Sequence, residues 1–361
     1  MQKCANITKK RFKSFNSNIY MSKLSRTQLI NALTTLGTYL TKPDEELKNI
    51  IATERQHNAW FTTGNVTKAI TAIGNTLTPD ELEEWLNKYD LDKNTSVKKI
   101  GLILAGNIPL VGFHDVLCVL VTGNHALIKA SGQDARLIKF ILQKLVNIEP
   151  AFANQFTFVE RLENFDAVIA TGSNNTSRYF EYYFGKVPHI IRKNRNSVAV
   201  LSGDETEAQL HNLGHDIFDY FGLGCRNVSK LLVPKDYNLT FFFESIEPYQ
   251  PIIDHHKYNN NYDYNKSIYL VNGEKHFDNG FLLVKEDARW VSPLAVLYYE
   301  YYGDIQSVED TINRESDKIQ CIVSALPLKV QSQVVDFGMS QQPGLVDYAD
   351  GVDTMKFLTE L

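Results

Sequence analysis

One segment constrains the fold of this chain more than any other: residues 97–131 read as a strand, a helix and a second strand. Residues 98–105 form a short apolar run bounded by turn residues, which is typical of a buried strand rather than an amphipathic helix. Pro109 suits the first turn of a helix over residues 110–121, which is apolar on nearly every face and therefore predicted to be buried. Residues 126–129 form the next strand, so the segment predicts a βαβ unit with a right-handed crossover.

Polar residues follow the strands of this unit. Asn107 comes just after the first strand, and Lys129 ends the second. Ligands of parallel sheets bind at the carboxyl ends of strands, so both are candidate ligand contacts. The alternatives stay open, because an asparagine in a turn often bonds only its own backbone and a lysine at a strand end is commonly just solvated.

Strands and helices continue to alternate beyond this unit. A helix is expected over residues 133–146 and a longer one over 204–221, and this alternation predicts a doubly wound α/β sheet followed by a second α/β unit. The further strands are expected near Phe156 and over residues 167–170, 189–192, 197–201, 230–234, 267–271, 280–284, 295–302 and 319–324. Residues 251–266, rich in Asn, Asp, His and Tyr, are expected to form a long surface loop.

Composition excludes several classes of protein. A chain of 361 residues that is 43% hydrophobic and 22% charged is typical of a soluble globular protein. The net charge of −5 argues against a nucleic-acid partner. We found neither the apolar core of a signal peptide nor a membrane-spanning segment, and therefore expect a cytoplasmic location. Residues 1–20 are interpreted as a disordered extension or an upstream start.

The four cysteines are far apart and show no Cys-x-x-Cys spacing, so neither a metal site nor a disulfide is expected. Cys118 and Cys321 lie in apolar segments and are predicted to act as small hydrophobes. Cys225 instead follows Gly224 in a turn, with Arg226 next to it and Lys230 nearby. An exposed, electropositive turn favours a nucleophilic thiolate, whereas the alternative is a buried cysteine after a helix.

A second short motif, Thr171-Gly172-Ser173, stands between a predicted strand and a predicted helix. Backbone amides at the start of a helix bind anions, so these residues are candidate contacts for a phosphate or a ribose.

The order of these motifs resembles a known family. The chain presents Gly-Asn-x-Pro, then Gly-Asn-x-Ala-x-x-Lys-x-Ser, then Thr-Gly-Ser, then Gly-x-x-Cys after a long helix. This order resembles the aldehyde dehydrogenase superfamily and, more closely, the LuxC-type acyl-CoA reductases. Residues 347–358 are similar to that family as well, so the resemblance covers roughly residues 97–358.

The resemblance implies an aldehyde dehydrogenase-like α/β fold with a helical N-terminal lead-in. The implied parts are a helical region over residues 1–96 packed on a doubly wound cofactor-binding domain, that domain itself over 97–221 with a return segment at 336–361, and a smaller α/β catalytic domain over 222–335.

The resemblance also assigns roles to individual residues. Cys225 matches the family nucleophile, and Asn107 matches the asparagine whose amide forms the oxyanion hole with the nucleophile's own N–H. Lys129 and Ser131 match a Lys-x-Ser that touches the adenosine ribose. Gly172, with Ser173 after it, matches a Gly-Ser near the pyrophosphate.

The implied activity is an NADPH-dependent reduction of a fatty acyl thioester to the aldehyde through an acyl-enzyme on Cys225. The glutamate that activates water in hydrolytic relatives is absent, since residues 193–197 replace its segment, so hydrolysis is disfavoured. Gly132 lacks the acidic side chain that would repel a 2'-phosphate, so NADPH is permitted. The family resemblance favours NADPH without excluding NADH.

Two other functions remain open. One is a cysteine acyltransferase or thioesterase without a redox cofactor. The other is a non-catalytic scaffold subunit, which Leu223 and Lys230 keep open because relatives carry glutamine and arginine there.

The partners implied are an acyl-CoA or acyl-protein thioester, an acyl-activating ligase, and a second copy of the chain in a homo-oligomer. The aromatic residues at 241–243 and 298–302 are interpreted either as the lining of an acyl tunnel or as ordinary core.

Overall fold

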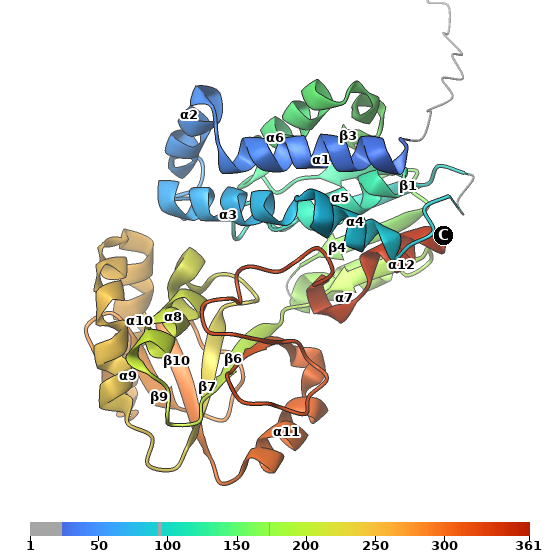
Figure 1. Ribbon diagram of the computed structural model, residues 1–361. Coiled ribbons are helices and arrows are strands. Elements are labelled where there is room, and N and C mark those ends of the chain that lie inside the picture. Colours follow the sequence, from blue (N-terminus) through green and yellow to red (C-terminus); the bar gives the residue numbers. More distant parts are fainter. Residues whose placement is uncertain (1–23, 93–95, 173) are drawn as a thin grey trace, which may run out of the picture.

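The computed structural model describes residues 24–92, 96–172 and 174–361, and builds them around two β-sheets (Figure 1). The predicted extension over residues 1–20 and the predicted contact Ser173 lie outside the described residues.

The first sheet contains the predicted βαβ unit. Its strands are all parallel, in the order β3-β2-β1-β4-β5. They are β1 (Lys99–Ile103), β2 (His125–Lys129), β3 (Phe156–Phe158), β4 (Ala167–Thr171) and β5 (His189–Arg192). Right-handed crossovers that run in opposite directions from β1 and from β4 place their helices on opposite faces. Helices α5 (Phe113–Val121) and α6 (Ala135–Ile148) therefore cover one face and α7 (Asn174–Phe184) the other.

Helices from the N-terminal region complete this half of the molecule. They are α1 (Arg26–Thr41), α2 (Glu45–Thr53), α3 (Thr63–Thr76) and α4 (Pro79–Asn87). Their starts carry ordinary signals, such as the capping box of Ser25 and Gln28 on α1 and Pro79 in the first turn of α4. Their buried leucines join the hydrophobic core of the first sheet, as the predicted lead-in requires.

The second sheet has the order β12-β11-β6-β7-β10-β9-β8 and is parallel except for the β8/β9 pair. Its strands are β6 (Asn196–Val200), β7 (Val228–Pro234), β8 (Phe277–Asp278), β9 (Leu283–Glu286), β10 (Val296–Tyr302), β11 (Ile319–Val323) and β12 (Val334–Val335). Its helices are α8 (Glu207–Phe218), α9 (Leu239–Ile246), α10 (His256–Asn272) and α11 (Ile305–Arg314).

One strand belongs to a different sheet than predicted. The sequence placed β6 before a division at residue 221, but β6 pairs with β7 and β11 in the second sheet. The sheets therefore part between β5 and β6, because hydrogen bonding to later strands outweighs adjacency along the chain. The division into a cofactor-binding and a catalytic domain stays a proposal, with the sheet boundary moved to this point.

The predicted loop over residues 251–266 and the predicted strand over 267–271 were wrong, since helix α10 occupies most of both. Tyr258, Tyr262 and Tyr269 are buried and provide its apolar side, although the segment looks polar. Asn265 is satisfied internally, because its amide donates to the carbonyls of Asn261 (2.9 Å) and Leu294 (3.0 Å). Gly273, with φ of 66°, ends the helix in the left-handed conformation.

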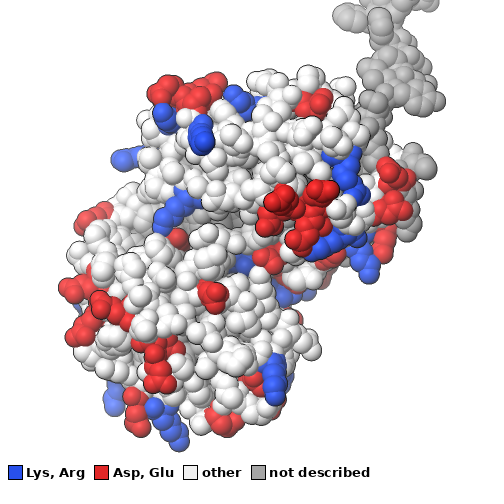
Figure 2. Space-filling model, viewed as in Figure 1, with Lys and Arg blue, Asp and Glu red and all other residues white. Residues whose placement is uncertain are grey.

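The C-terminal segment returns from the second sheet to the first half, where α12 (Thr354–Thr359) packs against α5 (Figure 1). The phenol of Tyr348 anchors it by accepting a hydrogen bond from Trp85 Nε1 at 2.7 Å. On the face in Figure 2, acidic and basic side chains are interspersed among uncharged ones. Within the described ranges, no helix combines the length and apolar character needed to cross a bilayer.

Candidate active site

Most of the predicted cofactor contacts lie at one edge of the first sheet. The chain leaves β1 toward β2 and β3 on one side and later adds β4 and β5 on the other, so the switch point lies between β1 and β4. Ile103 pairs with Lys129 on β2 and with Ala170 on β4, which brings the carboxyl ends of the three strands together. Parallel sheets bind ligands at such a point.

The predicted contact residues at this edge differ in their exposure, packing and hydrogen bonding. Lys129 is exposed. Ser131 packs closely on Gly106: a Cβ built on Gly106 would lie 2.3 Å from the Ser131 hydroxyl oxygen. Thr171 ends β4. The Gly172 N–H donates to the carbonyl of Arg192 at 3.4 Å, so this predicted phosphate contact already has a partner.

Cys225 lies in a strained turn between α8 and β7. Tyr220, Phe221 and Gly222 adopt left-handed φ values of 55°, 60° and 76°, and left-handed backbone at a non-glycine residue costs about 1–3 kcal/mol. The ring of Phe221 packs against those of His255 and Trp60, with centroid distances of 4.2 and 5.2 Å. These contacts hold the strained backbone in place.

Asn227 fixes the same turn and was not identified from the sequence. Its Oδ1 accepts the Gly224 N–H at 2.8 Å, while its Nδ2 donates to the carbonyl of Asp219 at 2.9 Å. The side chain is buried, so it acts as an internal clamp between the end of α8 and the cysteine turn. Its position two residues after Cys225 was the only signal in the sequence.

Asn107 joins the two halves of the site. Its Nδ2 donates to the carbonyl of Leu223 at 2.8 Å, across the gap between the first sheet and the cysteine turn. The structure thus brings Asn107 and Cys225 to one place, although they come from different sheets. Because the amide has two N–H groups, one remains for another acceptor.

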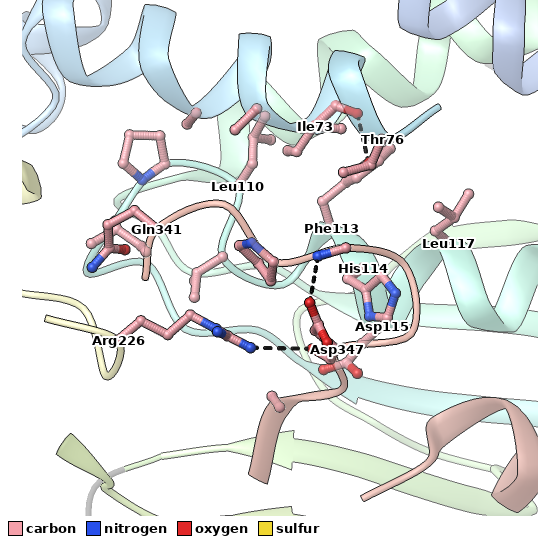
Figure 3. A pocket seen from close by; sticks show the side chains of 18 of the residues that line it. Ile73, Thr76, Leu110, Phe113, His114, Asp115, Leu117, Arg226, Gln341 and Asp347 are labelled. Carbon is pink, nitrogen blue, oxygen red and sulfur yellow. Dashed lines mark hydrogen bonds between the residues drawn. The ribbon is translucent and has the colours of Figure 1, made fainter. Parts of the chain in front are cut away.

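Cys225 lines a pocket of about 190 Å³. Figure 3 shows α3 and α5 side chains on one side, Arg226 on the other, and Gln341 and Asp347 of the C-terminal segment between them. The apolar part of the lining consists of Ala69, Ala72, Ile73, Leu77, Ile108, Pro109, Leu110, Val111, Phe113, Leu117, Pro343, Leu345 and Ala349. The aromatic segments at 241–243 and 298–302 do not line it; Phe242 and Tyr298 are buried in the core of the second sheet, so their interpretation as a tunnel was wrong.

The predicted electropositive setting of Cys225 is only partly present. Burial raises the pKa of the Cys225 thiol to about 11, the neighbouring Arg226 lowers it, and Asp350 raises it further. Lys230 is buried elsewhere; its ammonium group contacts Glu300 at 2.5 Å and lies 4.9 Å from the centroid of the Trp290 ring. The resting protein therefore holds a neutral thiol.

This raised pKa predicts the pH dependence of alkylation. The thiolate is the reactive form, so the rate of Cys225 modification by iodoacetamide should rise about tenfold per pH unit between about pH 7 and 10. Mass spectrometry of the Cys225 peptide would measure it. A rate that levels off below about pH 8 would contradict the raised pKa.

A buried ion pair lies beneath the pocket. The Arg192 Nη2 contacts Asp115 Oδ1 at 2.6 Å and donates to the Thr354 hydroxyl at 2.9 Å. Arg192 thereby ties the end of β5 to α5 and to the C-terminal segment. Asp115 belongs to the pocket lining, so the pair supports the wall of the site.

Replacing Arg192 with methionine should destabilise the protein by about 3–5 kcal/mol, because it leaves the buried Asp115 carboxylate unpaired. Urea unfolding would measure the loss. The double variant Arg192→Met with Asp115→Leu should recover much of it. A loss below about 1 kcal/mol in the single variant would show that the pair is well solvated.

The architecture and the site define the class of protein first: an α/β enzyme fold of the aldehyde dehydrogenase type. The structure is similar to P. syringae AldA, an indole-3-acetaldehyde dehydrogenase in complex with NAD+ and IAA (TM-score 0.64, 14% identity, covering 88% of this chain and 77% of that one). It is also similar to an acetylating aldehyde dehydrogenase from Geobacillus thermoglucosidasius (TM-score 0.61, 10% identity, covering 90% and 86%). At these identities the likeness shows the fold, and it confirms the predicted fold class.

The chain belongs to the LuxC acyl-CoA reductase family, whose model matches residues 48–241. A long-chain acyl-protein thioester reductase from Aliivibrio fischeri is 25% identical in an alignment 185 residues long, which covers 46% of this chain and 38% of that protein. The alignment thus spans well under half of this relative. The predicted family resemblance is confirmed.

Proposed function

We propose that this protein reduces a fatty acyl thioester to the aldehyde, with NADPH as reductant and with Cys225 as the acyl carrier. The observation that carries the proposal is the position of Cys225, which opens into an apolar pocket while Asn107 reaches its turn from the switch-point edge. Family membership and the name of the Aliivibrio relative support an acyl thioester as substrate.

The residues at the switch-point edge fit a dinucleotide. A Cβ built on Gly132 would meet no atom within 4 Å, so the surface beside Lys129 and Ser131 has room for a 2'-phosphate. Lys129 and Ser131 would hold the ribose, and Thr171 and Gly172 would lie near the pyrophosphate. When bound, the nicotinamide supplies a hydride.

The protein's own groups carry the acyl transfer. The Cys225 thiol loses its proton as its sulfur attacks the thioester carbonyl, and a new C–S bond forms. The bond to the carrier sulfur then breaks, and the carrier takes up one proton in place of the one that Cys225 released, so that it leaves as a thiol. The free N–H of Asn107 and the Cys225 N–H stabilise the oxyanion during this step. Leu110, Phe113 and their apolar neighbours bind the acyl chain and exclude water.

One carboxylate near the thiol bears on hydrolysis of the acyl-enzyme. Asp350 is the carboxylate whose charge acts on Cys225, and its Oδ1 lies 3.4 Å from Nε of Arg195. Burial raises the pKa of Asp350, whereas Arg192 and Arg195 lower it. Membership of an acyl-CoA reductase family is what favours reduction over the thioesterase alternative.

The test is oxidation of NADPH or NADH by the purified protein with a series of acyl-CoA thioesters, with aldehyde trapped as product. Thioester-dependent oxidation establishes the reductase and reveals chain length and cofactor preference. Acylation of Cys225 without cofactor oxidation would favour the acyltransferase. If neither acylation nor cofactor oxidation occurs, even when an acyl-protein or a ligase-activated acyl group is supplied as donor, the scaffold is favoured.

A further inference from the structure

The loop between β1 and α5 carries Asn107 and much of the pocket wall, and its backbone is unusual. Leu110 has a φ of 58°, which leucine rarely adopts, and its buried side chain lines the pocket. Helix α5 therefore starts at Phe113 rather than at residue 110 as predicted. A strained loop of this kind persists only where contacts around it enforce it.

The contact that holds Leu110 comes from Asp134. The Leu110 N–H donates to Asp134 Oδ2 at 2.9 Å, and the aspartate is only 4% exposed. Its other oxygen, Oδ1, has no hydrogen-bond partner among the described residues. The carboxyl group is thus buried next to the loop with Leu110 as its hydrogen-bond donor.

The use of Asp134 is unexpected for its place in the chain. It is the N-cap residue of α6, where an aspartate ordinarily accepts an N–H of its own helix. Here the side chain makes no capping hydrogen bond, whereas Asp44, Asp304 and Asp353 cap their helices in the usual way. Asp134 therefore does not cap α6, and its side chain instead holds the backbone of Leu110 in place.

The buried surroundings of the Asp134 carboxyl group disfavour its ionised form. Burial raises the pKa of Asp134 to about 8, although the Leu110 N–H lowers it, and the nearby Glu54 raises it further. Glu54 is itself fully buried and paired with Arg136 at 3.1 Å. Near pH 7 the Asp134 carboxyl group is therefore mostly uncharged, and its observed contact is the acceptance of the Leu110 N–H.

We propose that Asp134 is a positioning residue for the oxyanion site: by fixing Leu110, it sets the path of the loop that presents Asn107 to the cysteine turn. The catalytic part of this inference, the placement of Asn107 as an oxyanion donor, rests on the proposed function. Leu110 is three residues from Asn107, so relaxation of its strained backbone would shift the asparagine amide and the adjoining pocket wall together. Even a small displacement of a group that acts on the reacting atoms lowers the rate of reaction strongly.

The test compares three variants of the full chain. Asp134→Asn keeps an acceptor of the same shape for Leu110 without the charge. Asp134→Ser can cap α6 but is too short to reach Leu110, so it removes the loop contact while protecting the fold. Asp304→Ala, which removes an ordinary cap on α11, is the matched control.

We expect hydrogen exchange of the peptide spanning residues 104–113 to rise about tenfold in Asp134→Ser and to stay near wild type in Asp134→Asn and in the control. With a thioester substrate identified by the cofactor-oxidation assay, kcat should fall about ten- to a hundredfold in Asp134→Ser, with KM for the nicotinamide unchanged and with recovery in Asp134→Asn.

Unchanged exchange in Asp134→Ser would overturn the proposal, since Leu110 would then be held by other contacts. Raised exchange with an unchanged kcat would overturn it too, because the loop position would not matter for turnover. Lack of thioester reduction by the wild type would instead be a failure of the proposed function, and the exchange result would still decide whether Asp134 holds the loop.

Discussion

Cys225→Ala is expected to abolish both acylation of the protein and aldehyde formation, a loss of at least about 10⁴-fold. The thiol lines the apolar pocket and lies on the turn that Asn107 contacts, so it is the nucleophile that the acyl chain would meet. Mass spectrometry of the protein after incubation with acyl-CoA would follow the acyl group, and trapping of the aldehyde would follow the product.

Cys118→Ala provides the control, because Cys118 is a fully buried cysteine within α5. It should keep most of the activity and the acylation of Cys225. Substantial turnover in Cys225→Ala, or an acyl group found on Cys118 or Cys321 in the wild type, would refute the proposed nucleophile.

Asn107→Ala should lower kcat by about a hundred- to a thousandfold, the usual effect of removing one oxyanion donor. The Nδ2 group already donates to Leu223, so the side chain is aimed at the cysteine turn before substrate arrives. Measuring the rate of acyl-enzyme formation in a single turnover would assign the loss to the step in which the oxyanion develops.

Because the same hydrogen bond also helps hold the cysteine turn, the variant needs a second measurement. Alkylation of Cys225 by iodoacetamide develops no oxyanion, so its rate should stay within about twofold of wild type in Asn107→Ala. A matching drop in alkylation would mean that the turn itself has moved. An unchanged kcat would mean that other groups build the oxyanion hole.

Local patterns predicted much of the fold. The apolar run before Asn107 and the short strand ending at Lys129 form β1 and β2, and the helices after them appear as α5 and α6. Such elements are readable because apolar spacing and turn residues act over a few neighbouring positions. Tyrosine, by contrast, serves as a buried side chain in α10 while it reads as polar, which hid that helix.

The sequence by itself determined the order of the βαβ units, the polar residues at their strand ends, and the isolated glycine-flanked cysteine. Only the tertiary structure decided that β6 joins the second sheet, that Asn107 reaches Leu223, and that Asp134 serves the loop at Leu110 instead of its own helix. The physical reason is the distance along the chain over which the interactions act. Strands, helices and caps follow from interactions between near neighbours, whereas these contacts join residues distant in the chain, and their geometry exists only once the chain has folded.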